Sequence, residues 1–306
     1  MPLPLNFRTV QLDDRKLFKE IRQCCDLYCT SPASETTFES VFCWAAGDFA
    51  QVCIIDEGII IFYEYASGLK AFYPPLVRSK EDFVPVLQRI REHCIFSGFD
   101  LYIERMTKEM AELAEGFAAA NGYKIFEERN AFEYLYNAAD FIGLKGGNYK
   151  SKRNLVHGFT ADYDFEFLPY EPSLKKGILD LVTYLGNPIA MPYQMEFAAI
   201  ERALDCADAL NLHCDVIKAE GEIVAFHICF INEANVGTCL FEKSNTGFRG
   251  SYTAITHFSS EKRFSNCTLI NRQEDLGIEG LRTSKMSYLP VGFSEKYIIK
   301  KEPELN

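Results

Sequence analysis

The chain has 306 residues, of which 48% are hydrophobic and 25% are charged. This length suits one large domain or two ordinary ones, and the composition excludes a disordered protein. A formal net charge of −11 argues against a general nucleic-acid-binding protein, although it is compatible with a local cationic site.

The cysteines and the apolar runs indicate the cellular compartment of the protein. Eleven cysteines are scattered, mostly in apolar stretches, without a CxxC pair. We expect buried free thiols in a reducing compartment rather than disulfides or a metal site. The opening stretch MPLPLNFRTVQLDDRK does not resemble a secretory signal, and no apolar run reaches the ~20 residues of a membrane helix. The prediction is a cytoplasmic protein with no transmembrane segment.

The first half predicts a mixed domain of helices and strands. Helical spacing of apolar residues, caps and glycine stops predict four helices, at 13–29, 35–46, 80–94 and 107–122. Short runs rich in β-branched and aromatic residues predict strands at 50–56, 58–65, 69–75, 99–106, 123–128 and 131–137.

The second half repeats this order. Helices are expected at 148–159, 173–186, 196–210 and 251–264, and strands at 164–170, 213–220, 222–231, 235–245, 267–272 and 294–301. The repeated order predicts an α+β protein with two tandem domains, 1–140 and 141–306, although no repeat is visible at the level of residues. Each domain is expected to hold a mostly antiparallel sheet flanked by helices, and the turn residues near Asp140–Gly147 favour a boundary there. The order also resembles that of the GNAT acyltransferase fold.

The stretch EKSNTGFRGSYTAITHF, residues 242–258, is a candidate anion site. A strand ends near Asn245, two glycines frame Arg249, and a helix begins near Ser251. The amides of Gly250 and Ser251, the helix dipole and the guanidinium would together favour a phosphate. An ordinary glycine turn with Ser251 as helix cap explains the pattern equally well. The phosphate-binding pattern of GNAT enzymes is matched only in part, because position 247 is Gly and position 252 is Tyr.

The predicted helix 148–159 carries a second set of cations. Helical spacing places Lys150, Arg153 and His157 on one face, with Lys152 on another. These side chains could hold a phosphate or a carboxylate. A solvated basic face is the simpler explanation of the same spacing.

The stretch LINRQEDLGIEGLRTSKMSYLP, residues 269–290, combines a strand end with many charges. Asn271 and Arg272 would lie at the C-terminal end of the strand. In open α/β sheets, ligand-binding sites often lie at such strand ends. If a helix follows, Lys285 shares a stripe with two apolar residues, so it must be paired or serve a ligand. If residues 285–289 are instead extended, the pattern gives less support to an inward-facing Lys285.

These residues carry a resemblance that covers nearly the whole chain. Its most specific parts are Asn-Arg-x-Glu-Asp-Leu-Gly at 271–277, Gly-Leu-x-x-x-Lys at 280–285 and Glu-Lys-Tyr at 295–297. With them, the chain resembles soluble bacterial proteins related to the C-terminal domain of phosphatidylglycerol lysyltransferase, and more distantly Fem-type aminoacyltransferases. The resemblance implies two tandem GNAT-like domains, aminoacyl-tRNA as donor, a site mainly in the second domain, and Lys285 near the reacting centre.

The resulting hypothesis is an aminoacyl- or acyltransferase. The donor would be aminoacyl-tRNA or a coenzyme A thioester, and the acceptor an amine or hydroxyl of a small molecule or a lipid headgroup. Lys285 and Arg282 would stabilise the developing charge, and Glu274 or Asp275 would accept a proton. The donor phosphate would lie on Arg249, Gly250, Ser251, Lys150, Lys152 and Arg153, with Asn271, Arg272, Glu242 and His157 in support.

Two other functions fit the same residues. One is a non-catalytic scaffold of the same architecture that binds a small anion or a protein partner. The other is a small-molecule N-acetyltransferase that uses acetyl-coenzyme A, and the incomplete phosphate-binding pattern counts against it. Neither a metal nor a redox cofactor is expected.

Overall fold

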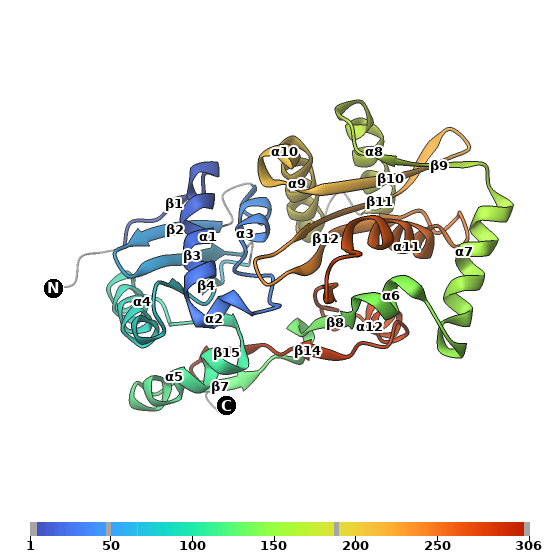
Figure 1. Ribbon diagram of the computed structural model, residues 1–306. Coiled ribbons are helices and arrows are strands. Elements are labelled where there is room, and N and C mark those ends of the chain that lie inside the picture. Colours follow the sequence, from blue (N-terminus) through green and yellow to red (C-terminus); the bar gives the residue numbers. More distant parts are fainter. Residues whose placement is uncertain (1–4, 47–49, 66, 187–189, 303–306) are drawn as a thin grey trace. The chain divides into compact units, whose positions relative to one another are not determined.

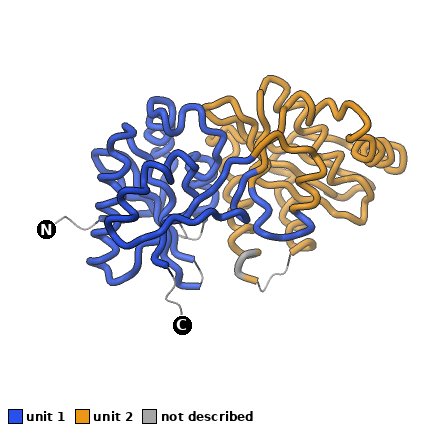
Figure 2. The backbone as a smooth tube through the Cα atoms, turned by 90° about the horizontal axis from the view of Figure 1, so that it is seen from below, with its two compact units in different colours: residues 1–133, 274–281, 293–306 blue, residues 134–273, 282–292 orange. Residues whose placement is uncertain are grey.

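The computed structural model describes residues 5–46, 50–65, 67–186 and 190–302. Figure 2 shows the chain divided into two compact units. Unit 1 comprises residues 1–133, 274–281 and 293–306, and unit 2 comprises residues 134–273 and 282–292. The predicted division after residue 140 assigns the C-terminal strand to the second domain, whereas that strand lies in the sheet of unit 1.

Unit 1 is built on a sheet with the strand order β1-β2-β3-β4-β6-β15-β7, and β5 pairs with β3. β4 and β6 are parallel, and the other pairs with a defined register are antiparallel. The strands are β1 (Arg8–Thr9), β2 (Ala50–Ile55), β3 (Gly58–Glu64), β4 (Lys70–Phe72), β5 (Leu76–Val77), β6 (Ile103–Met106), β7 (Lys124–Glu127) and β15 (Tyr297–Lys300).

The helices of unit 1 begin and end at residues suited to those positions. The Thr37 side chain accepts a hydrogen bond from the Ser40 amide at the start of α3, and Thr107 does the same for Met110 at the start of α5. α4 ends at Gly98, which is left-handed with φ 75°. The helices are α1 (Arg15–Cys24), α2 (Asp26–Cys29), α3 (Phe38–Trp44), α4 (Phe83–Ser97) and α5 (Lys108–Ala120), with 3-10 turns at Leu12–Asp14, Lys80–Asp82 and Arg129–Ala131.

Unit 2 holds the second sheet, with the order β14-β8-β13-β12-β11-β10-β9. β12 and β13 are parallel, while β8–β13, β9–β10, β10–β11 and β11–β12 are antiparallel. The strands are β8 (Glu133–Asn137), β9 (Phe165–Pro169), β10 (His213–Ala219), β11 (Glu222–Ile231), β12 (Val236–Ser244), β13 (Leu269–Asn271) and β14 (Gly292–Ser294).

Figure 1 shows α11 lying along β11 and β12. α11 contacts both strands and also contacts α7. The core beneath it contains Phe159, Ile217, Ala225 and Ile255, all fully buried. The helices are α6 (Ala138–Gly143), α7 (Lys150–Asp162), α8 (Lys175–Leu185), α9 (Met191–Asp205), α10 (Ala207–Leu210), α11 (Ser251–Phe264) and α12 (Glu279–Met286), with 3-10 turns at Gly147–Tyr149 and Pro172–Leu174. Within the described ranges, no helix has both the length and the apolar character needed to cross a membrane.

A β-bulge between β11 and β12 decides which side chains share a face of this sheet. Ile228 is paired with Phe241, but the next pair is Cys229 with Cys239, so Leu240 is an extra residue on β12. Such an insertion re-aims the side chains that follow it. Cys239 therefore lies on the same face as Glu242, whose partner across the strands is His227.

Candidate functional site

Arg272 forms the centre of a buried polar cluster in unit 2. It follows Asn271 at the end of β13 and is 6% exposed. One terminal nitrogen donates to Glu242 Oε2 on β12 at 2.5 Å, and the guanidinium lies 5.0 Å from the centre of the Tyr288 ring. Burial opposes ionisation of Glu242, but the guanidinium outweighs it and lowers the pKa of this carboxyl, so the pair is charged.

Two buried polar atoms of this cluster make no hydrogen bond of good geometry within the described chain. The second terminal nitrogen of Arg272, Nη1, is buried without a hydrogen bond. The Tyr288 hydroxyl is buried as well; the Thr253 and Thr256 hydroxyls lie near it, but neither makes a hydrogen bond of good geometry with it. Buried donors without a partner are rare in folded proteins because each costs about 1–3 kcal/mol. A buried guanidinium nitrogen of this kind, with the Tyr288 ring 5.0 Å from the guanidinium, suits a site that receives a polar atom of a ligand.

Lys152 on α7 joins the same cluster. Its ammonium lies 4.0 Å from the centre of the Tyr288 ring. Burial and the nearby Arg272 lower the pKa of Lys152 to about 8. A lysine of that pKa can exchange a proton near neutral pH, which an ordinary lysine does not.

Lys285 on α12 contacts the main chain of this strand end. Its ammonium donates to the carbonyl oxygens of Arg272 and of Gln273, the latter at 3.1 Å. Its own carbonyl accepts from the Tyr136 hydroxyl at 2.9 Å. Lys285 thus joins α12 to the residues that follow β13. Arg282 lies one turn earlier on α12 and is half-buried.

Glu274 and Asp275 lie in unit 1, where each is held by an arginine. The Arg105 guanidinium donates to Glu274 at 2.8 Å. Asp275 is fully buried, accepts from Arg129 at 3.4 Å and binds the Gly277 amide at 2.8 Å. Both carboxylates therefore serve ion pairs within this unit.

The turn before α11 contains three predicted site residues, Arg249, Gly250 and Ser251, and each has a different environment. Arg249 is exposed, and its amide donates to the Tyr163 hydroxyl at 3.2 Å. Ser251 is fully buried and does not cap the helix: its hydroxyl bonds the Ser244 hydroxyl at 2.6 Å and the Asn245 carbonyl at 3.0 Å.

Gly250 is required by this turn. Its φ is +91°, and a Cβ there would lie 2.4 Å from the Leu155 carbonyl oxygen on α7. We expect Gly250→Ala to lower the free energy of unfolding by about 1–3 kcal/mol, because both the backbone and the contact with α7 become strained. Urea denaturation measures this loss. Gly147→Ala, where a Cβ meets nothing within 4 Å, is the control; equal stability of the two variants would contradict the prediction.

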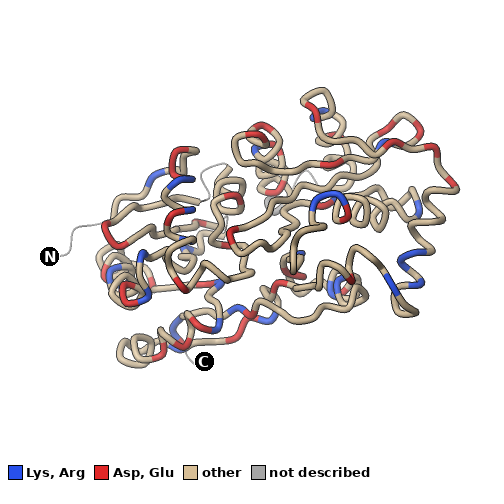
Figure 3. Tube along the Cα trace, in the orientation of Figure 1, with Lys and Arg blue, Asp and Glu red and all other residues tan. Residues whose placement is uncertain are grey.

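The other predicted residues of α7 lie outside the cluster. Lys150 and His157 are exposed, and Arg153 donates to the carbonyls of Leu144 and of Gly146, the latter at 2.8 Å. Figure 3 shows basic residues gathered at the start of α7. The structure thus brings together Arg272, Glu242, Lys152 and Lys285 within unit 2, with Asn271 buried beside them and accepting from the Gln273 amide at 2.7 Å.

Sequence reasoning named Glu242 but missed His227 and Cys239, which the β-bulge brings to this cluster, and Thr256 of α11. His227, Cys239 and Glu242 each place one potential ligand atom within 4.8 Å of the others. A divalent metal could use such a set, but Glu242 is already bound by Arg272 and by the Thr256 hydroxyl at 2.5 Å. The neighbouring guanidinium would repel a metal ion, so the ion pair explains these residues better.

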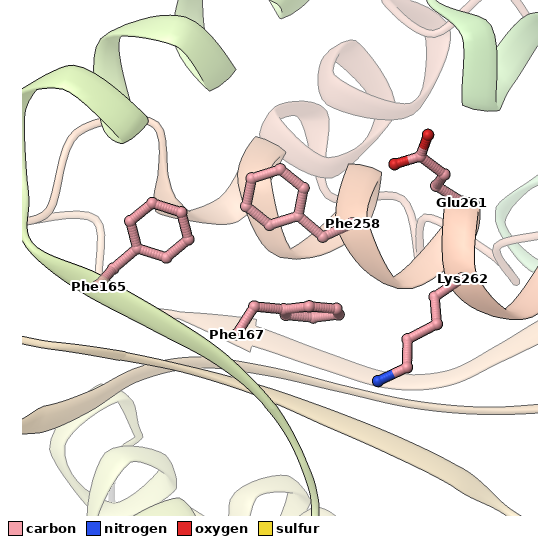
Figure 4. Close-up of a pocket in the computed structure, with 5 residues that line it drawn as sticks. All are labelled: Phe165, Phe167, Phe258, Glu261 and Lys262. Carbon is pink, nitrogen blue, oxygen red and sulfur yellow. The ribbon is translucent and has the colours of Figure 1, made fainter.

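A separate hollow of about 360 Å³ lies elsewhere in unit 2, and Figure 4 shows its lining. Its walls are Phe165 and Phe167 of β9 and Phe258 of α11, with Glu261 and Lys262 at the side. The rings of Phe165 and Phe258 are parallel, 5.8 Å apart. None of the predicted site residues lines this hollow.

Comparison with known proteins identifies the family. Residues 29–300 match the family model described as phosphatidylglycerol lysyltransferase, C-terminal. The chain belongs to this family. The resemblance drawn from the motifs at 271–285 and 295–297 is therefore confirmed.

Structures of proteins similar to this chain have been solved. A conserved protein of unknown function from Bacteroides thetaiotaomicron is 26% identical, with a TM-score of 0.82 over 97% of this chain and 100% of that one. L-PGS from Bacillus licheniformis is 15% identical, with a TM-score of 0.61 over 87% and 88% of the two chains. An uncharacterized protein of Mycoplasmoides gallisepticum is 25% identical over 173 residues, so the match spans only 55% of that curated relative and 55% of this chain.

More distant structures identify the fold. FemX, 9% identical, has a TM-score of 0.59 over 96% of this chain and 97% of its own. A tandem GNAT protein from the clavulanic acid biosynthesis pathway, 10% identical, has a TM-score of 0.58 over 98% and 100% of the two chains. The predicted α+β fold with two tandem GNAT-like domains is thus confirmed.

Proposed function

We propose that this chain transfers an activated acyl group to an amine or hydroxyl acceptor, with the Arg272 cluster of unit 2 as its reaction centre. Membership of the phosphatidylglycerol lysyltransferase family and a fold shared with GNAT and Fem-type proteins support a transferase. Aminoacyl-tRNA is our first choice of donor and a coenzyme A thioester the second. The hydroxyl of a lipid headgroup is our first choice of acceptor.

The observation that carries the proposal is the buried Arg272 Nη1, which has no hydrogen-bond partner in the described chain, with the buried Tyr288 ring 5.0 Å from the same guanidinium. Attack on an ester or thioester turns its carbonyl oxygen into an oxyanion. Donors already in place in a water-poor site stabilise that charge, and one such donor typically contributes about 10²–10³ in rate. Glu242 holds the guanidinium in position through its other nitrogen.

Lys152 acts as the acid–base group in this scheme. In its neutral form it accepts the proton of the attacking hydroxyl or amine as the new bond to the acyl carbon forms. The oxyanion then collapses, the bond to the leaving oxygen or sulfur breaks, and Lys152 returns the proton to the leaving atom. A base with a pKa near the working pH is suited to this task.

The remaining predicted residues take supporting roles. Lys285 is a positioning residue, because its ammonium binds the carbonyls of Arg272 and Gln273. Arg249 and Lys150 are exposed and are our candidates for contact with a donor phosphate. We assign no proton transfer to Glu274 or Asp275, since Arg105 and Arg129 hold them.

The direct test supplies the protein with lysyl-tRNA or an acyl-coenzyme A and with vesicles of phosphatidylglycerol, and follows the acyl group by mass spectrometry. Transfer from either donor supports the proposal and names the donor. A protein that binds neither donor and transfers nothing, while remaining folded, would leave a non-catalytic scaffold as the better description.

The pH dependence of transfer is the second test of this proposal. Because the reactive form of Lys152 is the neutral amine and its pKa is about 8, we expect kcat to rise with pH through about 8 and then level. Lys152→Arg should lower kcat and abolish the rise, because arginine stays protonated over this range. Lys150→Arg, on the exposed side of the same helix, is the matched control. A rise that persists in Lys152→Arg would exclude Lys152 as the base.

A further inference from the structure

The sheet of unit 2 has an open edge at β9, its last strand. The register of β9 against β10 decides which main-chain groups face that edge. The Tyr170 amide donates to the Cys214 carbonyl at 2.9 Å, so the even-numbered residues of this strand turn their main-chain groups towards β10. The N–H and C=O groups of Phe165 and Phe167 therefore point to the open edge, where no strand of the described chain pairs with them.

The side chains of these two residues line the hollow of about 360 Å³ shown in Figure 4. Phe258 of α11 forms its third wall, and its ring centre lies 5.8 Å from that of Phe165 and 5.6 Å from that of Phe167. All three side chains are only partly buried. A strand added beside β9 would therefore cover apolar rings as well as form main-chain hydrogen bonds.

Exposed carboxylates surround this edge. Side chains alternate between the two faces of a strand, so Asp164 and Glu166 lie on the face opposite the two phenylalanines. Glu261 borders the hollow itself. Six acidic residues around the edge are exposed and form no ion pair with a described residue: Asp162, Asp164, Glu166, Glu171, Glu220 and Glu261.

The cations in this region do not balance these carboxylates. Lys262 borders the hollow but lies 3.3 Å from Asp215, which also binds Arg263 at 2.6 Å. Lys218 is the neighbour of Glu166 across the strands, and no ion pair joins the two in the described chain. The open edge is therefore an apolar surface within a field of negative charge.

This charge distinguishes between the possible occupants of the edge. A second copy of the chain would bring its own acidic edge against this one, and like charges across paired strands are unfavourable. An anionic lipid surface would be repelled for the same reason. Charges on an edge strand also protect it from aggregation, but that role does not require exposed rings beside them. An extended peptide with basic and apolar side chains suits both features.

We propose that the edge of β9 binds an extended peptide in which apolar and basic residues alternate, as an added strand of the unit 2 sheet. The apolar side chains of the peptide lie in the hollow, and its basic side chains lie over Asp164 and Glu166. Its main chain bonds the N–H and C=O groups of Phe165 and Phe167. None of the residues assigned to acyl transfer lines the hollow, so this binding is independent of the proposed reaction.

The test is a fluorescence-anisotropy titration of the labelled peptide Lys-Val-Lys-Phe-Lys-Val-Lys with the whole chain. We expect saturable binding that weakens as the salt concentration rises. The peptide Lys-Lys-Lys-Lys-Val-Phe-Val has the same composition but cannot place its apolar and basic side chains on opposite faces. It should bind about 10-fold more weakly. Equal affinity for the two peptides would reduce the interaction to attraction between net charges and overturn the proposal.

Changes in the peptide test each contact without affecting the fold of the protein. Replacing its Phe by Ala should weaken binding about 10-fold, because the ring is no longer buried in the hollow. Methylating the main-chain nitrogens of one alternate set of residues should abolish binding, because strand addition needs those N–H groups. Binding that tolerates methylation of either set would exclude an added strand.

Glu166→Lys tests whether the peptide binds at β9. This exposed position faces the basic side chains of the peptide, so the variant should bind about 3- to 10-fold more weakly at low ionic strength. Glu115→Lys makes the same change at an exposed position on α5 of unit 1 and should bind almost as the unaltered chain does. An equal loss in both variants contradicts the proposal. Phosphatidylglycerol vesicles that bind the chain when the peptide does not would replace it with a lipid surface.

Discussion

Arg272→Lys should transfer acyl groups about 10²–10³-fold more slowly than the unaltered chain, with most of the loss in kcat. Lysine keeps a positive charge beside Glu242, so the buried carboxylate retains a partner. It has no second nitrogen held in the place of Arg272 Nη1, which is the atom that we assign to the oxyanion. Steady-state kinetics with the donor found in the transfer assay measure the effect.

Tyr288→Phe separates catalysis from folding at the same site. The hydroxyl of Tyr288 is buried and makes no hydrogen bond of good geometry with the nearby Thr253 and Thr256 hydroxyls, so removing it should change the free energy of unfolding by no more than about 1 kcal/mol. A role in folding alone therefore predicts a protein of nearly full activity. Our proposal predicts a stable protein whose kcat falls by about 10²-fold. Full activity in both Arg272→Lys and Tyr288→Phe would remove this cluster from the reaction.

Lys296→Met should strongly destabilise unit 1. The ammonium of Lys296 is fully buried and lies 2.9 Å from both Glu35 and Glu133, and 2.8 Å from the Ser294 hydroxyl. Removing it leaves two buried carboxylates without their cation, which typically costs about 3–5 kcal/mol. Urea denaturation measures this loss as the change in the free energy of unfolding.

The pH dependence of the Lys296→Met variant distinguishes lost charge from lost packing. Burial raises the pKa of Glu35, so the folded state favours its protonated form and this contribution to stability fades as the pH rises through that pKa. Without Lys296 the penalty of the ionised form grows, and the loss should be smaller at about pH 5 than at about pH 8. The variant that combines Lys296→Met with Glu35→Gln and Glu133→Gln should recover much of the stability. If the loss in the free energy of unfolding does not depend on pH, the lost packing of the Lys296 side chain explains it, and the lost charge does not.

The order of elements could be read from the sequence because each element carries its own periodic pattern. Residues 213–245 contain short runs rich in β-branched and aromatic residues, separated by turn residues, and β10, β11 and β12 form there. The caps and stops of α4 and α5 are local as well, since Gly98 and Thr107 act on the residues beside them. The motif that identifies the family, 271–285, is continuous in the chain. Local information was therefore enough for the fold class and the family.

The partners of the charged residues were decided only by the tertiary structure. Spacing predicts which face of an element a side chain occupies, but not what lies opposite that face. Lys285 binds main-chain carbonyls, Glu274 pairs with Arg105 far away in sequence, and Lys152 packs on Tyr288. Cys239 shares a face with Glu242 because of one inserted residue in a strand. Such pairings depend on the register of strands and the docking of helices, which no single segment of sequence specifies.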